Sequence, residues 1–353
     1  MTLKVAIIAD DLTGSLDTGT PFMEAGLSVA VAIDVEAVGK ALETGAEVVV
    51  VNTASRGLSE EEAVARVRAT AEALSSAGSA IFMKKIDSRL KGNVAAESIA
   101  LADMLGLKNI LMAPAIPDQE RITYRGCVVG RGVEHPLPIA DLFSGYGRNV
   151  NIADAEDDAD LDMIVSENDW LSTLAVGARG LGSALARRLG EAARVAPEFP
   201  TTRKTLFAFG SRDPITAVQM DRLVASQALR IVVDAPMGIV ESGEGLALPA
   251  LLRCTGEMQG NAALVAARFA QGVKSVIDDT RPDMIMVGGG DTALAVFREL
   301  GVTVLLPKGE IEAGVPWFDV RDVNGRQFRC AVKSGGFGNS DSLLRLIVRN
   351  QAA

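Results

Sequence analysis

Two adjacent aspartates, Asp10 and Asp11, directly follow a short apolar run near the start of the chain. This run, residues 5–9, is rich in β-forming residues and is bounded by charge, which is typical of a parallel strand buried on both faces. Ligands of open α/β sheets bind at the carboxyl ends of such strands. We therefore expect the two carboxylates to face a ligand, where they can orient hydroxyl groups and accept a proton.

Two further polar loops follow expected strands in the first half of the chain, and both carry positive charge. Lysine and arginine bind carboxylate or phosphate, whereas serine, asparagine and aspartate bind hydroxyl groups. The pattern indicates a pocket for a small anionic polyhydroxy acid, although any one of these loops would equally fit a solvated turn. The residues expected at this substrate pocket are Thr13, Arg56, Lys84, Lys85, Asp87, Ser88, Arg89 and Asn93.

Three glycine-containing loops follow expected strands in the second half of the chain. Glycine lets backbone N–H groups approach a phosphate closely, and the N-terminus of a following helix adds a favourable dipole. The sequence has no GxxxxGK[ST] motif, so a nucleotide would be bound by other means. The residues expected to bind the nucleotide are Ser211, Arg212, Gly288, Gly289, Gly290, Asp291, Thr292, Lys333, Gly335 and Gly336.

The glycine loop at 288–293 also satisfies the G-x-G-x-x-A spacing of dinucleotide-binding folds. The acidic residue of that fingerprint is poorly placed here, because Pro307 and Lys308 follow the next expected strand. An NAD(P)-dependent oxidoreductase therefore stays open as an alternative, as does a plain strand–helix turn. A non-catalytic sugar-acid-binding protein is a further alternative.

Composition narrows the function classes. The chain has 353 residues, a net charge of -10 and 48% hydrophobic residues, which favours about two globular domains and argues against nucleic acid as a partner. No apolar run reaches the roughly 18 residues of a membrane span, and no leader pattern precedes the first strand, so we expect a cytoplasmic protein. A single histidine, His135, and three scattered cysteines argue against histidine triads and disulfide frameworks. Catalysis must then use carboxylates, lysines, arginines and backbone dipoles.

Short β-type runs alternate with helical segments along the chain, which predicts parallel sheets with helices on their faces. We expect strands at 5–9, 28–33, 47–51, 80–83, 109–113, 205–209, 231–234, 284–287 and 302–306, and helices at 15–26, 35–43, 59–77, 95–105 and 260–278. Residues 121–147 are expected to be loop-rich, and the proline-containing segment 196–204 to be a linker. The expected fold is α/β, with two α/β domains of mainly parallel sheets, 1–200 for the substrate and 201–353 for the nucleotide, and an active site in the cleft between them.

The combination and order of these motifs resemble the four-carbon acid sugar kinase family over nearly the whole chain. The matching segments are ADDLTG at 9–14, TASR at 53–56, KKIDSRLKGN at 84–93, PAIPDQER at 114–121, GARGL at 177–181, GSR at 210–212, GGDTA at 289–293 and KSGGFG at 333–338. The resemblance implies an N-terminal domain that binds the sugar acid and a C-terminal domain that binds ATP. The implied product is the 4-phosphate of threonate or erythronate. Arg89, where the family has threonine, and Glu120, where it has glycine, depart from the pattern.

On this interpretation ATP is the phosphoryl donor and Mg²⁺ bridges its phosphates, with metal ligands left open. Asp10 and Asp11 are the expected catalytic residues, and one of them accepts the proton of the attacking 4-hydroxyl. Neighbouring residues of an extended chain point in opposite directions, so we expect unequal roles for the two. The sequence does not choose between D-threonate, L-threonate and D-erythronate, and a homodimer is expected only as the commonest oligomer.

Overall fold

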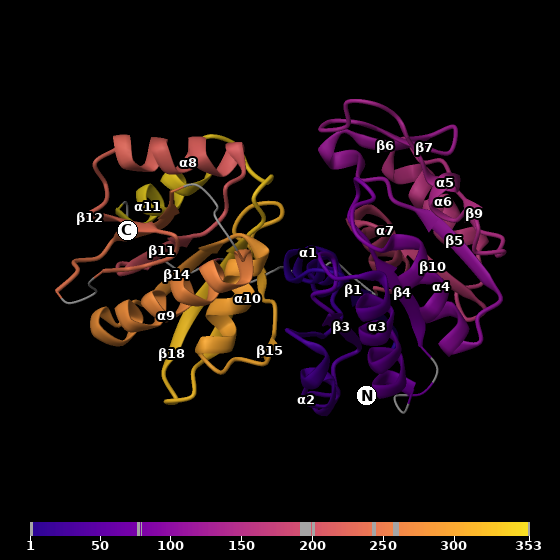
Figure 1. Cartoon of the computed structure of the whole chain (residues 1–353), viewed down its shortest axis with the longest axis horizontal. Coiled ribbons are helices and arrows are strands. Elements are labelled where there is room, and N and C mark those ends of the chain that lie inside the picture. Colours follow the sequence, from indigo (N-terminus) through magenta and orange to yellow (C-terminus); the bar gives the residue numbers. More distant parts are fainter. Residues whose placement is uncertain are drawn as a thin grey trace. The chain divides into compact units, whose positions relative to one another are not determined.

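The computed structural model describes residues 3–351 apart from 76–77, 79, 191–198, 200–201, 242–244 and 257–260, with side chains described up to residue 347. The chain divides into two compact units, 1–195 and 196–353, which Figure 1 colours from indigo to yellow along the sequence. The expected domain boundary between residues 200 and 201 lies outside the described residues. So do most of the expected linker at 196–204, the end of the helix expected at 59–77 and the start of the helix expected at 260–278.

Unit 1 is built on a parallel sheet in the order β2-β3-β1-β4-β10-β5-β9. The strands are β1 (Val5–Ala9), β2 (Val29–Ala32), β3 (Val48–Asn52), β4 (Ile81–Lys85), β5 (Asn109–Ala113), β9 (Asn151–Ile152) and β10 (Thr173–Gly177). The central strands β1 and β3 are buried along their whole length, as their continuous apolar sequences predict. The expected α/β class with mainly parallel sheets is therefore confirmed for this unit.

Helices cover both faces of this sheet, and local capping explains where they begin and end. They are α1 (Leu12–Glu24), η1 (Val35–Ala37), α2 (Val38–Glu43), α3 (Glu60–Ser75), α4 (Val94–Leu105), α6 (Asp158–Glu167) and α7 (Arg179–Leu189). Helix α1 begins three residues before the expected position, because the Asp11 carboxylate caps it by accepting from the Gly14 amide. Helix α4 ends at Gly106 in the left-handed conformation.

The segment 121–147 was expected to be loop-rich, and this expectation was only partly correct, because short strands and a helix alternate with turns. It folds into a small antiparallel sheet of β6 (Arg121–Tyr124), β7 (Cys127–Gly130) and β8 (Leu137–Pro138), followed by α5 (Ile139–Leu142), and the turn η2 (Pro117–Gln119) precedes it. Arg125 and Gly126 form the two-residue hairpin turn, both with positive φ. Arginine rarely adopts that conformation. Of the Asn-Gly or Asp-Gly pair that usually marks such a turn, this sequence therefore shows only the glycine.

Unit 2 contains a second sheet, in the order β12-β13-β11-β14-β18-β17-β16. Its first five strands are parallel, and β17 and β16 continue it in antiparallel fashion. The elements of this unit are β11 (Thr205–Phe209), α8 (Pro214–Ala225), β12 (Ile231–Pro236), β13 (Ala250–Thr255), α9 (Ala262–Thr280), β14 (Met284–Gly288), α10 (Gly290–Glu299), β15 (Val304–Leu305), β16 (Gly309–Glu310), β17 (Pro316–Arg321), β18 (Gln327–Lys333) and α11 (Ser342–Gln351).

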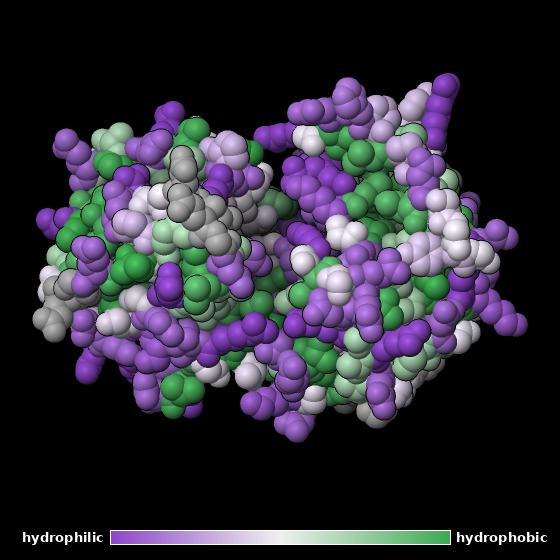
Figure 2. All heavy atoms as spheres, viewed as in Figure 1, coloured by the Kyte–Doolittle hydropathy of each residue, from purple (hydrophilic) through white to green (hydrophobic). Residues whose placement is uncertain are grey.

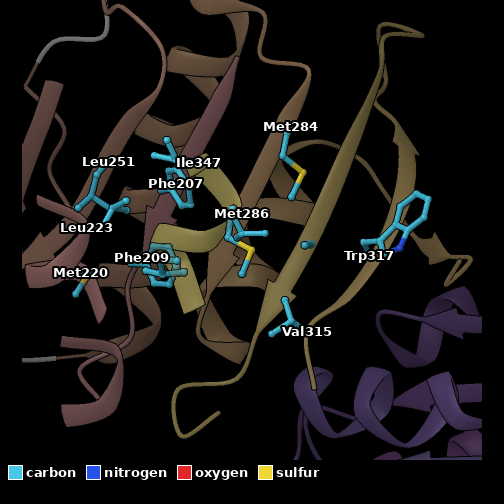
Figure 3. Close-up of a cluster of buried hydrophobic side chains, with 13 residues drawn as sticks. Phe207, Phe209, Met220, Leu223, Leu251, Met284, Met286, Val315, Trp317 and Ile347 are labelled. Atoms are coloured by element: carbon cyan, nitrogen blue, oxygen red, sulfur yellow. The ribbon is translucent and has the colours of Figure 1, made fainter. Parts of the chain in front are cut away.

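The core of unit 2 fixes the strands whose ends carry the glycine loops. Phe207 and Phe209, two residues apart on β11, point to the same face and pack with Leu223 of α8 and Ile347 of α11 (Figure 3). Both phenylalanines are completely buried. Burial of this many aromatic and aliphatic side chains stabilises the position of β11 between β13 and β14.

The surface of each unit is mainly polar on the side drawn in Figure 2, with apolar residues scattered between hydrophilic ones. None of the described helices is both long and apolar enough to cross a membrane.

Candidate functional site

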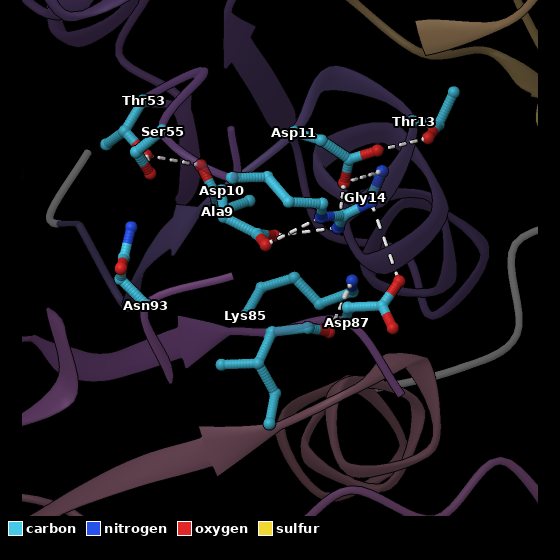
Figure 4. Close-up of polar contacts among 12 residues, drawn as sticks. Ala9, Asp10, Asp11, Thr13, Gly14, Thr53, Ser55, Lys85, Asp87 and Asn93 are labelled. Carbon is cyan, nitrogen blue, oxygen red and sulfur yellow. Dashed lines mark hydrogen bonds and ion pairs between the residues drawn. The ribbon is translucent and has the colours of Figure 1, made fainter. Parts of the chain in front are cut away.

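A charged cluster forms around Arg56 at the carboxyl edge of the unit 1 sheet (Figure 4). Arg56 Nε and Nη2 donate to Asp10 Oδ2 and Oδ1 at 2.8 and 2.9 Å, and Nη2 also donates to Asp11 Oδ1 at 2.8 Å. Its Nη1 lies 3.6 Å from Asp87 Oδ2. We call Asp10, Asp11, Arg56 and Asp87 the carboxylate–arginine cluster. The two-pronged contact with Asp10 uses the planar fork of the guanidinium, which holds it in one orientation.

Strand register brings this cluster together. Ala9, the last residue of β1, lies opposite Asn52 of β3 and Lys85 of β4, so the three following loops leave the sheet side by side. The backbone N–H and hydroxyl of Thr53 both donate to the Ala9 carbonyl, at 2.8 and 2.9 Å. The Ser55 amide donates to the Asp10 carbonyl at 3.0 Å. The loop that carries Arg56 is thus tied to the strand that carries the aspartates.

The two aspartates have different surroundings. Only 5% of the Asp10 side chain is exposed, against 19% for Asp11. Burial by itself raises the pKa of Asp10, but the hydrogen bonds and charge of Arg56, with the charges of Lys84 and Lys85, hold it below its usual range. The Asp11 carboxylate accepts from the Thr13 hydroxyl at 2.5 Å and from the Gly14 amide at 3.0 Å. Asp10 is therefore locked to Arg56, whereas Asp11 is partly open to solvent.

The two lysines at the end of β4 point to opposite faces of the sheet. Lys84 is completely buried, and its Nζ lies 2.7 Å from Glu97 Oε2 of α4. Lys85 donates to the Ile86 carbonyl at 2.8 Å and lies on the cluster side. A Cβ placed on Gly14 would be 2.6 Å from Lys85 Nζ and 2.5 Å from Asp11 Oδ1, so only glycine allows this approach. Lys85 therefore faces the cluster, and Lys84 is neutralised behind it.

The remaining predicted residues lie along the loop that follows β4. Asp87 joins the cluster, and its carboxylate also accepts from the Arg89 amide at 2.8 Å. Ser88 accepts a hydrogen bond from Arg121 Nη1 at 2.5 Å. Asn93 donates to the Leu58 carbonyl at 3.0 Å and so ties two loops together. Thr13, Lys85 and Asp87 therefore lie at the cluster, whereas Ser88 and Arg89 turn toward β6 and β7.

The glycine loops of unit 2 also meet through strand register. Phe209, Gly288 and Lys333 lie opposite one another on the neighbouring strands β11, β14 and β18. The amides of Gly210 and Ser211 both lie 3.2 Å from the Gly288 carbonyl, and the Gly289 amide donates to the Lys333 carbonyl at 3.0 Å. We use the name glycine loops for residues 210–212, 288–292 and 333–336.

These loops approach one another so closely that side chains would collide. A Cβ on Gly335 would lie 2.7 Å from the Ser211 hydroxyl, and one on Gly289 would lie 3.3 Å from the Ser211 amide nitrogen. Gly289 also has a φ of 101°, and it precedes α10 without a side chain to cap the helix. The first N–H groups of α10 are therefore open to an anion, where the helix dipole adds to their attraction.

Lys333 is the buried cation of this region. Its Nζ donates to the Thr216 hydroxyl at 3.1 Å and to the carbonyls of Ser334 and Gly335 at 2.9 and 3.2 Å. Burial lowers the pKa of Lys333 to about 8, although the carboxylates of Asp213 and Glu312 act in the opposite direction. Its three hydrogen-bond acceptors are neutral, so the ammonium remains suited to a phosphate. Arg212, on the first loop, donates to the Gly256 carbonyl.

Several supporting residues were missed from the sequence. Asp213 caps α8 by accepting from the Ile215 amide at 2.9 Å, and Pro214 follows it, a pattern that marks a helix start. Gln219 of the same helix donates to the carbonyls of Phe337 and Asn339 and so holds the segment directly after the last glycine loop. No local signal announces this contact, because the partners are more than a hundred residues apart.

Comparison with known proteins agrees with this division of the chain. The sequence profile of a sugar-binding N-terminal domain matches residues 5–140, and that of a nucleotide-binding C-terminal domain matches residues 247–343. A 3-oxo-tetronate kinase of Methylobacterium radiotolerans is 28% identical, over 97% of this chain and 98% of the relative. A D-threonate kinase of Cupriavidus necator is 27% identical, over 96% and 95%. The chain belongs to the four-carbon acid sugar kinase family.

Membership of the four-carbon acid sugar kinase family confirms the resemblance seen in the sequence motifs. A solved Haemophilus influenzae structure of the DUF1537 family shares the fold, with a TM-score of 0.71 at 20% identity over 98% of this chain and 99% of that one. The carboxylate–arginine cluster lies within the range matched by the sugar-binding profile. The glycine loops at 288–292 and 333–336 lie within the range matched by the nucleotide-binding profile.

Proposed function

We propose that this protein transfers the terminal phosphoryl group of ATP to the 4-hydroxyl of a four-carbon sugar acid, giving the 4-phosphate and ADP. The acid is of the D-threonate, L-threonate or D-erythronate type. The observation that carries the proposal is the pair of carboxylates held by one arginine at a parallel sheet edge of unit 1. Its counterpart is the group of glycine loops around a buried lysine in unit 2. The names of the relatives, kinases for D-threonate and 3-oxo-tetronate, support the same substrate class.

Asp11 is the residue we assign to the reacting hydroxyl. Its carboxylate is the more exposed of the two, and among the described residues one of its oxygens, Oδ2, is bonded only to the Thr13 hydroxyl. A carboxylate at this point can accept a hydrogen bond from the 4-hydroxyl and then its proton. Asp10, with its lowered pKa, stays ionised and positions Arg56. This assignment gives the unequal roles that the adjacent pair predicts.

The other cluster residues bind the substrate in this proposal. The hydroxyl groups of the acid contact Thr13, Asp87 and the guanidinium of Arg56, while Lys85 adds a positive charge to the same pocket. Lys84 and Asn93 support the pocket without contacting the acid. Lys84 is already paired with Glu97, and Asn93 is bonded to the Leu58 carbonyl. Ser88 and Arg89 contact the far end of the acid.

The phosphates of ATP are assigned to the glycine loops. Phosphoryl transfer requires mainly positioning and neutralisation of charge, which the helix N-terminus of α10 and the Lys333 ammonium supply. Ser211, Arg212 and Thr292 offer side-chain donors, and Gly288, Gly289, Gly290, Gly335 and Gly336 allow the backbone to approach. Mg²⁺ would neutralise the phosphates, and Asp213 and Asp291 are the carboxylates near these loops. One or two carboxylates with phosphate oxygens are the usual ligands of this ion.

The proposal is tested by measuring ADP release from ATP and Mg²⁺ with a panel of tetronates, longer aldonates and hydroxy-diacids. We expect turnover with at least one tetronate and a product carrying phosphate on the terminal hydroxyl. Stabilisation by a sugar acid without turnover would favour a non-catalytic sugar-acid-binding protein of the same fold. Stabilisation by ATP without turnover on any acid would mean that the ATP site is retained and the substrate is a different one. Reduction of NAD(P)⁺ without any effect of ATP on melting would favour the oxidoreductase. We place the activity in the cytoplasm, where ATP is available, and a homodimer stays a prediction.

A further inference from the structure

Arg89 and Arg121 lie close together beside the carboxylate–arginine cluster, and the backbone of Arg131 is bonded to Arg121. Arg121, at the start of β6, donates from Nε and Nη2 to the Arg131 carbonyl at 3.1 and 2.9 Å. A Cβ on Gly132 would lie 3.5 Å from Arg121 Nη2 and 4.0 Å from Arg89 Nη1, so both guanidinium groups border the same glycine. We call Arg89, Arg121 and Arg131 the arginine trio.

No carboxylate forms an ion pair with the trio among the described residues, although the charge of Asp87 acts on Arg121 from a greater distance. In the part of the chain that the structure describes, Arg121 is bonded to a backbone carbonyl and to the Ser88 hydroxyl, both neutral. These three bonds leave two of its five N–H groups without a described partner. Within the described ranges, none of the three guanidinium groups forms an ion pair. By contrast, Arg56 and Arg326 each contact two or more carboxylates. What distinguishes Arg121 is that it is partly buried and lies near a second arginine, Arg89, without such a partner.

Burial and like charge both act against the positive charge of Arg121. Burial and the neighbouring charges of Arg89 and Arg131 lower the pKa of Arg121, and Asp87 offsets only part of this. Arg89 and Arg131 are exposed, so a ligand can reach both side chains. A guanidinium binds a carboxylate with two parallel hydrogen bonds, and three of them around one point would hold it strongly.

The cations expected to bind the acid group are already occupied. Arg56 contacts three carboxylates of the cluster, and Lys84 is paired with Glu97. Lys85 donates to a carbonyl and lies beside Asp11. The loop after β4 connects the cluster with the trio. Asp87 contacts Arg56 of the cluster, and Arg89, two residues later, belongs to the trio. Ser88, between them, is bonded to Arg121. Three consecutive residues span at most about 10 Å, a reach comparable with that of a short-chain acid.

Resting on the proposed function, we propose that the arginine trio binds the carboxylate of the substrate, while the hydroxyl end of the acid lies at the carboxylate–arginine cluster. Arg121 is the fixed member of the trio, because Ser88 and the Arg131 carbonyl hold its guanidinium. Arg89 and Arg131 close on the carboxylate from the exposed side and act as specificity residues. The acid group thereby sets which hydroxyl reaches Asp11.

The test is calorimetric titration of the full-length protein, without ATP, with the three tetronates and with their neutral amides. The variants are Arg89→Gln, Arg131→Gln and the double variant. The control is Arg125→Gln on the same hairpin, whose guanidinium lies over the Tyr124 ring, 5.2 Å from its centre. We expect each single change to weaken acid binding about tenfold, as the loss of one charge-assisted contact would, and the double change to weaken it more. Binding of the amides and the behaviour of the control should stay at the wild-type level.

The ADP assay separates this inference from the proposed function. If the variants raise the KM for the acid and leave the KM for ATP unchanged, both stand. If the double variant binds and phosphorylates the acid as the wild type does, the trio is not the carboxylate site, although the kinase assignment survives. If no acid is phosphorylated but the acids bind and the variants lose that binding, the trio stands and the kinase assignment fails. Wild-type protein that binds acid and amide equally would overturn the inference.

Discussion

The two candidate sites are built from different materials. In unit 1, the chemistry lies on side chains, and every charge of the carboxylate–arginine cluster already has a partner within the protein. In unit 2, it lies mainly on the backbone of the glycine loops, with one buried lysine whose acceptors are neutral. The first arrangement suits the orientation of hydroxyl groups, and the second suits a phosphate.

This difference determines how each site should fail. Removal of one member of the cluster leaves its partner buried without a counter-charge, which costs stability as well as activity. A side chain added to a glycine loop crowds the neighbouring loop, so it should disturb a phosphate site made of backbone groups without leaving a buried charge unpaired. Substitutions in the cluster should therefore lower both stability and activity, whereas substitutions in the glycine loops should lower mainly ligand binding.

The largest effect on turnover is expected from Asp11→Asn. Asparagine still caps α1, and Arg56 keeps its contacts with Asp10 and Asp87, so the loss of stability should be smaller than in Asp10→Asn. Asparagine cannot accept a proton, however. We expect kcat to fall by about 10²- to 10⁴-fold with a nearly unchanged KM for ATP, measured by ADP release. Asp10→Asn is the matched control, and it should destabilise the protein because it weakens the bond to Arg56. Near-wild-type kcat in Asp11→Asn would remove this residue from catalysis.

The largest effect on stability alone is expected from Lys84→Met. This change leaves Glu97 buried without its ion pair, and we expect a loss of about 3 kcal/mol in the free energy of unfolding. The double variant Lys84→Met/Glu97→Leu should regain most of that loss, because two apolar side chains replace both charges. Its KM for the acid should equal the wild-type value. A raised KM for the acid in the double variant would show that Lys84 contributes to substrate binding.

Gly289→Ala should act mainly on the nucleotide. A side chain at a φ of 101° costs about 1–2 kcal/mol, and here it would also point at Ser211. Gly325→Ala is the control in the same unit, since its φ is also positive and open space surrounds it. We expect similar losses of stability in both, but an increase of about tenfold in the KM for ATP only in Gly289→Ala. Equal nucleotide affinities in the two variants would argue against phosphate at this loop.

The smallest expected effect is a pH dependence from Lys333. Its pKa is lowered to about 8 in the folded protein, so the ammonium is charged below that pH and neutral above it. We expect kcat/KM for ATP to fall as the pH rises through about 8, and Lys333→Arg to lose this dependence. Stability should change in the opposite sense and increase between pH 8 and the ordinary lysine pKa, because the unfolded chain binds more protons there. A profile that is flat to pH 9 would separate Lys333 from the phosphates.

Local patterns made much of this predictable. The strands expected at 109–113 and 205–209 have those bounds, because a short apolar run with polar flanks is decided by its own sequence. The loops after β1, β3, β4, β11 and β14 were expected at strand ends for the same reason. These loops lie at the same edge of their sheet because the strands run parallel, and the βαβ alternation in the sequence already implies parallel strands.

Partners distant in sequence were not predictable. Lys84 and Lys85 have the same side-chain type, and only the packing of α4 shows that Glu97 neutralises the first of them. Strand alternation placed them on opposite faces without indicating which face held the site. The hairpin that carries Arg131 was missed because Arg125 occupies a turn position usually taken by glycine or asparagine. Arg89 was expected in the pocket, but its neighbours Arg121 and Arg131 come from that hairpin.

The measurement that tests the division of labour most directly is a pair of calorimetric titrations, with D-threonate and with MgATP, on the wild type, Asp11→Asn and Gly289→Ala. The account predicts a crossed result. Asp11→Asn should weaken the binding of D-threonate and leave the binding of MgATP unchanged. Gly289→Ala should weaken the binding of MgATP about tenfold and leave the binding of D-threonate unchanged. If either variant lost both ligands while still folded, or if Gly289→Ala affected only the acid, the assignment of acid to unit 1 and nucleotide to unit 2 would be contradicted.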